Sequence, residues 1–565
     1  MTSPPDNKND DRNKPAPEEI NLGQIITQDE KEAEGFSQNV AQEPAEIVTV
    51  SKKAGMVGFY TFLSRIFGLG RDTLIAYLLG AKEAADAFYV AFRIPNLLRR
   101  LLAEGALTIS FIPVFTEYLR KDKKEAKKIA DYTFTLLTII LFVITVIGVV
   151  FAAFFVKMTA FGFTEDPQKY ALTVQLTRIT FPYIFLVSLG ALAMGILNSL
   201  KHFSTPAAAP ILLNVGIILT AFLLRHHVAQ PSTALAIGVI VGGTMQILLQ
   251  IPSLYKLGFL PRFAWNPKHP GVVKIVKLLI PSIYGSAVYQ LNLFAITFMA
   301  SFLSTGSVSY LWYADRVMEF PLGVFAISFA TVILPQLSDH AADKNMTKFK
   351  SAFMDGLRMI YFINLPATVG LIVLAELIIS VLFQHGSFNA ESTLFTARAL
   401  QCFAIGLPFV SASRITSSAF YALQDSKTPV RAANIAVFAN IAMGAILLKP
   451  FGHMGLAMGV AFGSFANFLL QMHDFRKKMG NLGLKKILPS FVKMLLASAG
   501  MGAALYWLQP LMRASLGPAV FARLFALILL ILIGVGVYAS LAKILRIGEV
   551  EHFTKLLQRR IKRKI

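Results

Sequence analysis

The segment Phe134–Val156, FTLLTIILFVITVIGVVFAAFFV, contains no charged side chain. About 20 apolar residues in an α-helix cross the hydrocarbon core of a bilayer, which is about 30 Å thick. Many other windows of this length are nearly free of charge, and the chain of 565 residues is 55% hydrophobic and 15% charged. A soluble domain carries about 25% charged residues. The runs also lack the period-two alternation of a β-barrel. The sequence therefore predicts an all-α polytopic membrane protein.

The apolar runs predict about fourteen membrane-spanning helices, over residues 54–80, 84–118, 132–157, 170–199, 206–225, 232–254, 272–304, 308–336, 351–382, 392–423, 428–449, 453–474, 488–509 and 518–545. Lys and Arg are concentrated in loops after even-numbered spans, such as RKDKKEAKK (120–128), whereas STGSVS (304–309) has none. Because basic loops stay in the cytoplasm, both termini are predicted to be cytoplasmic. Topology and contact with anionic membrane lipids explain the net charge of +22 without a nucleic-acid partner.

The sequence also contains an internal repeat. LAIGVIVGGTMQILLQ (235–250) matches LAMGVAFGSFANFLLQ (456–471) at 8 of 16 positions, with an offset of 221 residues. Pro206 and Pro429, and likewise Arg93 and Arg316, are 223 residues apart in similar contexts. A duplicated unit of six helices predicts two lobes, residues 51–255 and 256–480, related by an axis along the membrane normal. Helices 13 and 14, within residues 481–545, lie outside the duplication.

The two ends of the chain differ from the rest in composition. Residues 1–50 contain 11 acidic and 4 basic side chains and no apolar core of a signal peptide, so they predict a disordered acidic cytoplasmic arm. Residues 546–565 form a basic cytoplasmic tail. Signatures of hydrolases, phosphate-binding loops and metal sites are absent from the sequence. We therefore expect no catalytic activity, no cofactor and no metal site.

The first, second and eighth predicted spans carry charges that such helices normally exclude. A charge at the bilayer centre costs about 2.5–3.5 kcal/mol even on lenient insertion scales. Pro95 and Pro321 interrupt two of these spans, and irregular backbone at membrane depth is tolerated only inside protein or along a water-filled cavity. We therefore expect a central hydrated cavity between the lobes, lined by Arg65, Arg71, Asp72, Asp86, Arg93, Arg99, Arg100, Glu104 and Arg316.

Arginines outnumber acids in this set, so the cavity is expected to attract an anion. The planar guanidinium binds phosphate oxygens in pairs, which favours a phosphate or pyrophosphate held at membrane depth. A purely structural interpretation stays open for individual residues. Asp86 and Glu104 could be loop-end residues that reach water, and Asp315 with Arg316 could be a buried structural pair.

Four strings carry a resemblance to a known family: SRIFGLGRD (64–72), ADAFYVAFRIPNLLRRLLAEGALTISFIPVF (85–115), GSVSYLWYADRVMEFPLGVFAISFATVILPQLS (306–338) and FYALQDSKTPV (420–430). They resemble the MurJ (MviN) family of bacterial lipid II flippases, in the multidrug/oligosaccharidyl-lipid/polysaccharide exporter superfamily. The resemblance runs over about residues 51–545. It implies fourteen helices, inward- and outward-open states, and an arginine cluster at Arg65, Arg71, Arg99 and Arg316, with Asp72, Arg100 and Glu104 beside it. Asp86 matches the acidic position in ADAF, and Arg93 matches a basic one.

The resemblance implies a flippase that moves lipid II, an undecaprenyl-pyrophosphate-linked disaccharide-pentapeptide, across the bacterial inner membrane by alternating access. It also implies that helices 13 and 14 supply a groove for the polyprenyl tail. A coupling ion is possible, and Asn292 and Asn440 are candidate oxygen ligands. Two alternatives remain: a superfamily transporter for another polyprenyl-linked glycan or a drug, and a membrane enzyme acting on polyprenyl phosphates. Cationic drugs would favour an excess of buried acids, which the sequence does not have.

Overall fold

The computed structural model describes residues 55–100, 107–516 and 519–550 of the chain. The predictions for the acidic arm, for Glu104 and for residues 551–565 of the basic tail lie outside these ranges. Two units divide at Tyr60. In the first unit the described residues, 55–60, are helical. The second unit, Thr61–Ile565, contains the helices described below.

The described residues of the second unit form helices and no strand, which confirms the predicted all-α class. Residues 61–79 are helical and precede the first labelled helices: α2 Glu83–Arg99, α3 Thr108–Lys121, α4 Lys123–Val150, α5 Ala152–Thr159, η2 Phe161–Glu165, α6 Pro167–Thr180, α7 Tyr183–Ser199, α8 Ser204–Leu224 and α9 Pro231–Lys256. The later elements are α10 Pro270–Ala300, α11 Ser307–Pro321, η3 Leu322–Ile327, α12 Ser328–Ala342, α13 Met346–Phe383, α14 Ala390–Ala422, α15 Lys427–Phe451, α16 His453–Met479, α17 Leu484–Leu516 and α18 Val520–Ile544.

Eleven helical stretches in the described part of the chain are long and apolar enough to cross a membrane. They overlap eleven of the fourteen predicted spans. The other three predicted spans, 54–80, 84–118 and 272–304, coincide with the first helical residues, with α2 and α3, and with α10. The total of fourteen spans stays a prediction.

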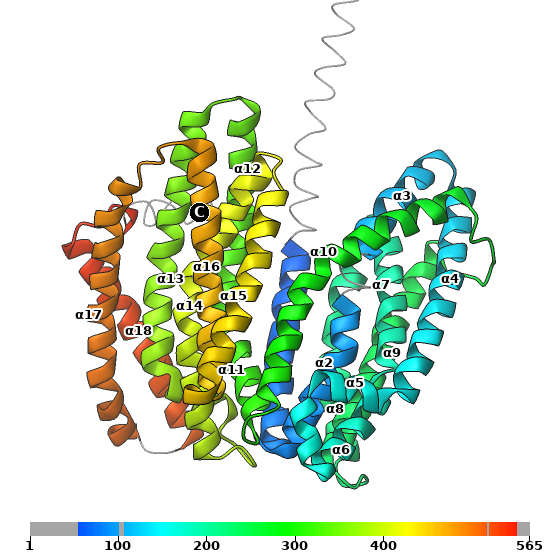
Figure 1. Cartoon of the computed structure of the whole chain (residues 1–565), viewed down its shortest axis with the longest axis horizontal. Helices are drawn as coiled ribbons and strands as arrows, with labels where there is room; N and C mark the ends of the chain where they lie inside the picture. The colour runs from blue at the N-terminus through cyan, green and yellow to red at the C-terminus, as the bar shows by residue number, and fades with distance from the viewer. Residues whose placement is uncertain (1–54, 101–106, 517–518, 551–565) are drawn as a thin grey trace, which may run out of the picture. The chain divides into compact units, whose positions relative to one another are not determined.

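The helices form two groups, and most contacts are between helices of the same group. In one group α9 contacts α6, α7 and α8, and α2 contacts α6. In the other, α14 contacts α13 and α16, α15 contacts α16, and α17 and α18 pack on α13 (Figure 1). The long helix α10 contacts α3 of the first group and α15 of the second, and α11 contacts both α14 and α2. Helices α10 and α11 therefore connect the two groups.

Glycines allow close helix contacts at equivalent places in the two groups. A Cβ added to Gly242 of α9 would lie 2.7 Å from the carbonyl oxygen of Leu213 on α8. A Cβ added to Gly463 of α16 would lie 2.9 Å from the carbonyl oxygen of Ala436 on α15. These residue pairs have the offsets of the sequence repeat, so α8–α9 and α15–α16 pack backbone to backbone in the same way, as small residues allow. The boundaries of the two lobes stay a prediction.

Candidate substrate site

The helix geometry changes at both places where the predicted site residues are concentrated. Helix α2 ends at Arg99, and the next described residues, Arg100 and Leu107, have π-helical backbone. Helix α11 ends at Pro321 and continues as a π-helix, η3. π-turns within α-helical segments occur frequently at functional sites. Pro95, inside α2, lies in the turn just before the basic end of that helix.

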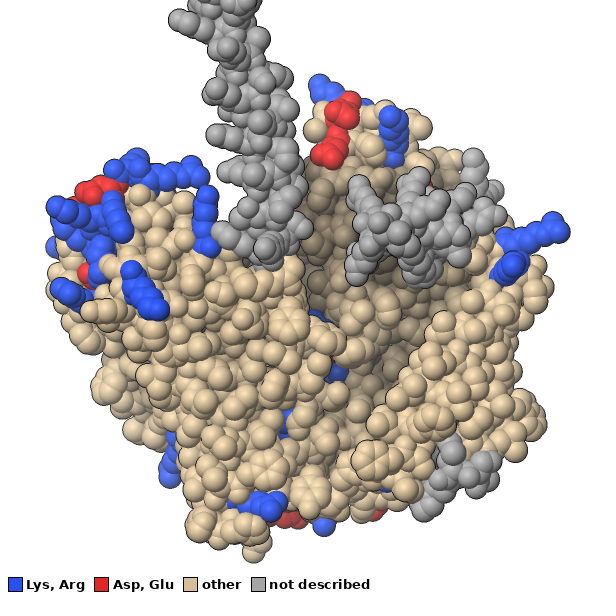
Figure 2. All heavy atoms as spheres, turned by 180° about the vertical axis from the view of Figure 1, so that it is seen from behind, with Lys and Arg blue, Asp and Glu red and all other residues tan. Residues whose placement is uncertain are grey.

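A pocket lies between α2, α10 and α11, and it is lined by Arg93, Asn96, Leu97, Arg100, Gln290, Leu293, Trp312, Asp315, Arg316 and Glu319. The structure thus brings together three of the predicted residues, Arg93, Arg100 and Arg316. They face two carboxylates, Asp315 and Glu319, so the lining carries a net positive charge. Figure 2 shows a hollowed face of the molecule with Lys and Arg side chains inside the hollow.

Arg316 has contacts on several sides. Its Nη1 donates to Oε2 of Glu319 at 2.7 Å, one turn further along α11. Its Nε lies 3.5 Å from Oδ2 of Asp72, on the helix of residues 61–79. Its guanidinium carbon lies 4.8 Å from the ring centroid of Trp312. Carboxylates therefore hold Arg316 while its side chain still lines the pocket.

The arginines of α2 are oriented by neutral polar groups. Nη1 of Arg93 donates to Oγ1 of Thr297 on α10. Nε of Arg99 donates to Oδ1 of Asn96 at 2.6 Å, one turn earlier on the same helix. These hydrogen bonds orient the two guanidinium groups. Arg93 and Asn96 both line the pocket.

Arg71 and Asp72 are packed within protein in this conformation. Arg71 is 7% exposed and Asp72 is 2% exposed. Nε and Nη2 of Arg71 donate to Oδ1 of Asp72 at 3.0 and 2.7 Å, and Nη1 donates to Oδ1 of Asn214 on α8 at 3.0 Å. These contacts tie the first helix to α8. Neither residue lines the pocket, and their predicted contact with substrate remains a prediction.

Arg65 lies on the same helix as Arg71, but its side chain is exposed. Its guanidinium lies against Gly323 in η3, where an added Cβ would lie only 1.8 Å from Nη1 of Arg65. The missing side chain at Gly323 therefore makes room for this arginine. Arg65 therefore lies beside η3, which directly follows α11, the helix that carries Arg316.

Asp86 lies at the beginning of α2 and does not line the pocket. It contacts Lys169 and the beginning of α11 instead. Its carboxylate accepts from Nζ of Lys169 at 2.9 Å, from the backbone N–H groups of Gly306 and Ser309 at 2.8 and 2.9 Å, and from Oγ of Ser309 at 2.6 Å. A carboxylate at a helix N-terminus satisfies unpaired N–H groups and interacts favourably with the helix dipole. Asp86 thus caps α11 from α2, and its predicted role toward substrate is untested.

Four residues of this arrangement were missed by the sequence reasoning. Trp312 precedes the ADR motif, and its aromatic ring was not considered as a partner for arginine. Asn214 and Thr297 are polar residues within apolar runs, and a search for polar side chains facing buried arginines would have found them. Lys169 begins a span, where a basic residue is unremarkable from sequence alone. Among the described residues, no group of three or more His, Cys, Asp or Glu could hold a metal ion.

Many apolar helices around an arginine-lined pocket define a membrane transporter. A family model described as "Lipid II flippase MurJ" matches residues 75–527, and the chain belongs to this family. A Vibrio cholerae protein named "Probable lipid II flippase MurJ" is 39% identical, over 89% of this chain and 97% of its own length. A Burkholderia cenocepacia "Lipid II flippase MurJ" is 40% identical, over 75% of this chain and 83% of its own length.

Solved structures give the same family and fold. A structure described as "Lipid II flippase MurJ, inward closed conformation" matches with a TM-score of 0.73 and 28% identity, covering 86% of this chain and 98% of that one. An inward-facing MATE-family multidrug transporter matches with a TM-score of 0.63, covering 74% of this chain and 95% of that one. At 14% identity the second match concerns the fold alone.

Proposed function

We propose that the chain is a lipid II flippase. It moves the undecaprenyl-pyrophosphate-linked disaccharide-pentapeptide from the inner to the outer leaflet of the bacterial cytoplasmic membrane. The observation that carries this proposal is the pocket in which Arg93 of α2 and Arg100, directly after α2, meet Arg316 of α11. Two phosphates need several guanidinium groups, which bind their oxygens through charge-assisted hydrogen bonds. Membership of the MurJ family supports the same substrate.

The proposed cycle makes and breaks no covalent bond. The headgroup enters the cationic pocket, and the arginines offset the cost of bringing the pyrophosphate to membrane depth. The two helix groups then rock against each other, and the headgroup is released on the opposite side. With both termini in the cytoplasm, a membrane potential that is positive outside would favour outward movement of an anion by about 2.3 kcal/mol per charge per 100 mV.

A coupling ion is a second possible source of energy. Asn440 Nδ2 donates to Asn292 Oδ1 at 2.6 Å, so these two candidate oxygen ligands contact each other across α10 and α15. Comparing transport in vesicles with an imposed potential and in vesicles with an imposed Na⁺ gradient separates the two sources. Transport that follows only the potential would rule out coupling to Na⁺.

Helices α17 and α18 are proposed to serve the polyprenyl tail. They pack on α13, and several of their large apolar side chains are exposed, among them Trp507 at 72% and Phe521 at 84%. Photo-crosslinking with a tail-labelled substrate tests this assignment. Labels confined to the first helix, α2 and α11 would refute it and would leave α17 and α18 as packing helices.

The central test replaces Arg316 by Ala and by Lys in a strain depleted of the wild-type protein. Loss of one charge-assisted contact removes about 1.5–3 kcal/mol, or roughly ten- to a hundredfold in substrate affinity. Lys keeps the charge but loses the paired geometry, so it should fall between wild type and Ala. Arg431→Ala is the matched control, because Arg431 is exposed and pairs with Asp474 outside the pocket.

Two results would contradict the proposal. If Arg316→Ala supports growth at normal membrane abundance, the cationic pocket does not bind the substrate. If the depleted strain accumulates a different lipid-linked precursor on the inner leaflet, the substrate is another polyprenyl-linked glycan. Purified protein assayed for both headgroup translocation and product formation distinguishes a flippase from an enzyme.

A further inference from the structure

Two guanidinium groups from different helices lie over a single indole ring. The guanidinium carbon of Arg93 lies 5.1 Å from the ring centroid of Trp312, and that of Arg316 lies 4.8 Å from it. Both distances are within the range of about 6 Å in which a cation interacts favourably with an aromatic face. Arg93 belongs to α2 and Arg316 to α11. Trp312 therefore contacts two of the three pocket arginines, one from α2 and one from α11.

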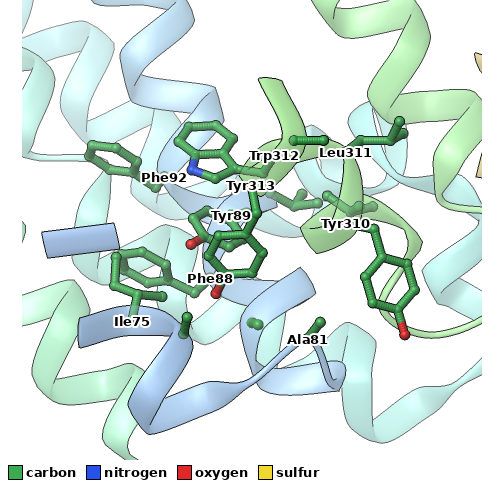
Figure 3. Packing of buried hydrophobic residues seen from close by; sticks show 14 of the residues in the cluster. Ile75, Ala81, Phe88, Tyr89, Phe92, Tyr310, Leu311, Trp312 and Tyr313 are labelled. Carbon is green, nitrogen blue, oxygen red and sulfur yellow. The ribbon is translucent and has the colours of Figure 1, made fainter. Parts of the chain in front are cut away.

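The indole is held in place by aromatic neighbours. Trp312 is 7% exposed and stacks on Tyr89 of α2, with ring centroids 4.6 Å apart and an interplanar angle of 23°. Phe92 meets it edge-on at 6.4 Å. Figure 3 shows the indole of Trp312 beside Phe92 and above Tyr89. Since α2 supplies both neighbours, the packing that fixes the ring also fixes its place relative to Arg93.

Packing alone does not explain a tryptophan at this position. The Nε1 of Trp312 is buried and has no hydrogen-bond partner among the described residues. A phenylalanine would fill part of the same space without a buried, unsatisfied donor. The indole, however, has the strongest cation–π attraction of the aromatic side chains. The contact with two cations gives a reason for its presence.

An aromatic face stabilises a cation differently from a carboxylate. Asp72 and Glu319 hold Arg316 but also cancel positive charge, which lowers the attraction for an anion. The indole carries no net charge, so it can hold two like charges near each other and leave their charge available to a ligand. Arginines already held in place lose less conformational freedom when a ligand binds.

We infer that Trp312 is a positioning residue for the pyrophosphate of the substrate, holding Arg93 and Arg316 at one side of the pocket for joint contact with the phosphates. This inference rests on the proposed function. Trp312 acts through these two arginines. The aromatic character of its ring, and not only the ring volume, should therefore determine the affinity of the pocket for pyrophosphate.

The test compares Trp312→Phe and Trp312→Met with wild type in purified, reconstituted protein. Phe keeps a weaker aromatic face, and Met fills the space without one. Affinity is measured for lipid II and for inorganic pyrophosphate, together with the transport rate at saturating substrate. We expect Met to weaken binding about 5- to 30-fold and Phe to weaken it less, with little change in the saturated rate. Trp265→Met is the matched control, because Trp265 is exposed in the loop between α9 and α10.

A spectroscopic measurement complements the affinities. The chain has three tryptophans, and replacing Trp265 and Trp507 by Phe leaves Trp312 as the only emitter. Adding pyrophosphate should change its emission, whereas chloride at equal ionic strength should not. This readout keeps the native ring, so it gives an answer even if the Met variant fails to accumulate.

The outcomes separate the inference from the proposed function. If the Phe and Met variants bind as wild type while Arg316→Ala binds weakly, Trp312 does not position the arginines and the flippase proposal stands. If Arg316→Ala also binds as wild type, the proposed pyrophosphate site itself is wrong. An emission spectrum that pyrophosphate leaves unchanged, with binding measured independently, also overturns the inference.

Discussion

Asp72 Oδ2 lies 3.5 Å from Nε of Arg316, so an ion pair joins the helix of residues 61–79 to α11. The other oxygen of the same carboxylate accepts two hydrogen bonds from Arg71. One buried acid therefore serves two guanidinium groups. Arg71 depends on this carboxylate, whereas Arg316 also pairs with Glu319.

Asp72→Asn should destabilise the protein by about 3 kcal/mol, because it leaves Arg71 buried with a neutral partner. The measurement is the thermal unfolding of purified protein. Adding Arg71→Met should recover part of the loss, since it removes the uncompensated charge. A double variant less stable than Asp72→Asn alone would contradict this account.

Gly323→Ala should leave the fold intact but displace Arg65. The new Cβ would lie 1.8 Å from Nη1 of Arg65, and the end of this exposed side chain can move away. We expect normal membrane abundance with substrate affinity reduced several-fold, measured by binding to reconstituted protein. Gly370→Ala is the control, because the space around that helical glycine in α13 is open. Equal affinities in the two variants would exclude a role for the position of Arg65.

Asp86→Asn should loosen the contact between α2 and the beginning of α11. It removes the charge that pairs with Lys169, which is itself 5% exposed. Ser307 is buried at the beginning of α11, so labelling of Ser307→Cys by a thiol reagent reports opening. The labelling rate should rise about tenfold or more, which corresponds to a shift of at least about 1.4 kcal/mol.

Two precautions sharpen the labelling experiment. Cys402 is buried and is replaced by Ala to remove background. Glu165→Gln serves as the control, because Glu165 is an exposed acid just before α6. If Asp86→Asn and Glu165→Gln raise the labelling rate equally, surface charge rather than the Asp86 cap controls access of the reagent to position 307.

Asp425, in the loop between α14 and α15, gives a pH-dependent prediction. Hydrogen bonds from Lys478 and from the backbone and side chain of Thr428 lower the pKa of its carboxyl from 3.8 to about 2. Because the unfolded chain takes up this proton first, the stabilisation is complete above about pH 4 and is lost as the pH falls toward 2. Asp425→Asn should lower the unfolding temperature at pH 7, and the difference from wild type should shrink near pH 2.5. A difference that is constant with pH would contradict this assignment.

The sequence predicted the helical class because uncharged runs such as Phe134–Val156 have no stable place outside a bilayer or a core. It also predicted that Arg93 and Arg316 line one cavity, because charged spans interrupted by proline are tolerated only inside protein or along water, and the pocket contains both. Periodicity could not predict that Arg71 would meet Asn214, a residue 143 positions away. It also could not place Asp86 at the beginning of α11, because capping between distant helices depends on how the helices pack. Partners of buried charges follow from tertiary packing, which a one-dimensional pattern does not contain.

The π-helix η3 has a mechanical consequence for the helix that follows it. A π-turn closes its hydrogen bond over one residue more than an α-turn does. If Leu322–Ile327 adopted regular α-helix, the residues of α12 would shift by about one position along the helix. Their side chains would then rotate by roughly 100° about the helix axis. Gly323 lies inside this segment, against Arg65. The six residues of η3 therefore affect both the position of the Arg65 side chain and the rotation of α12 about its axis.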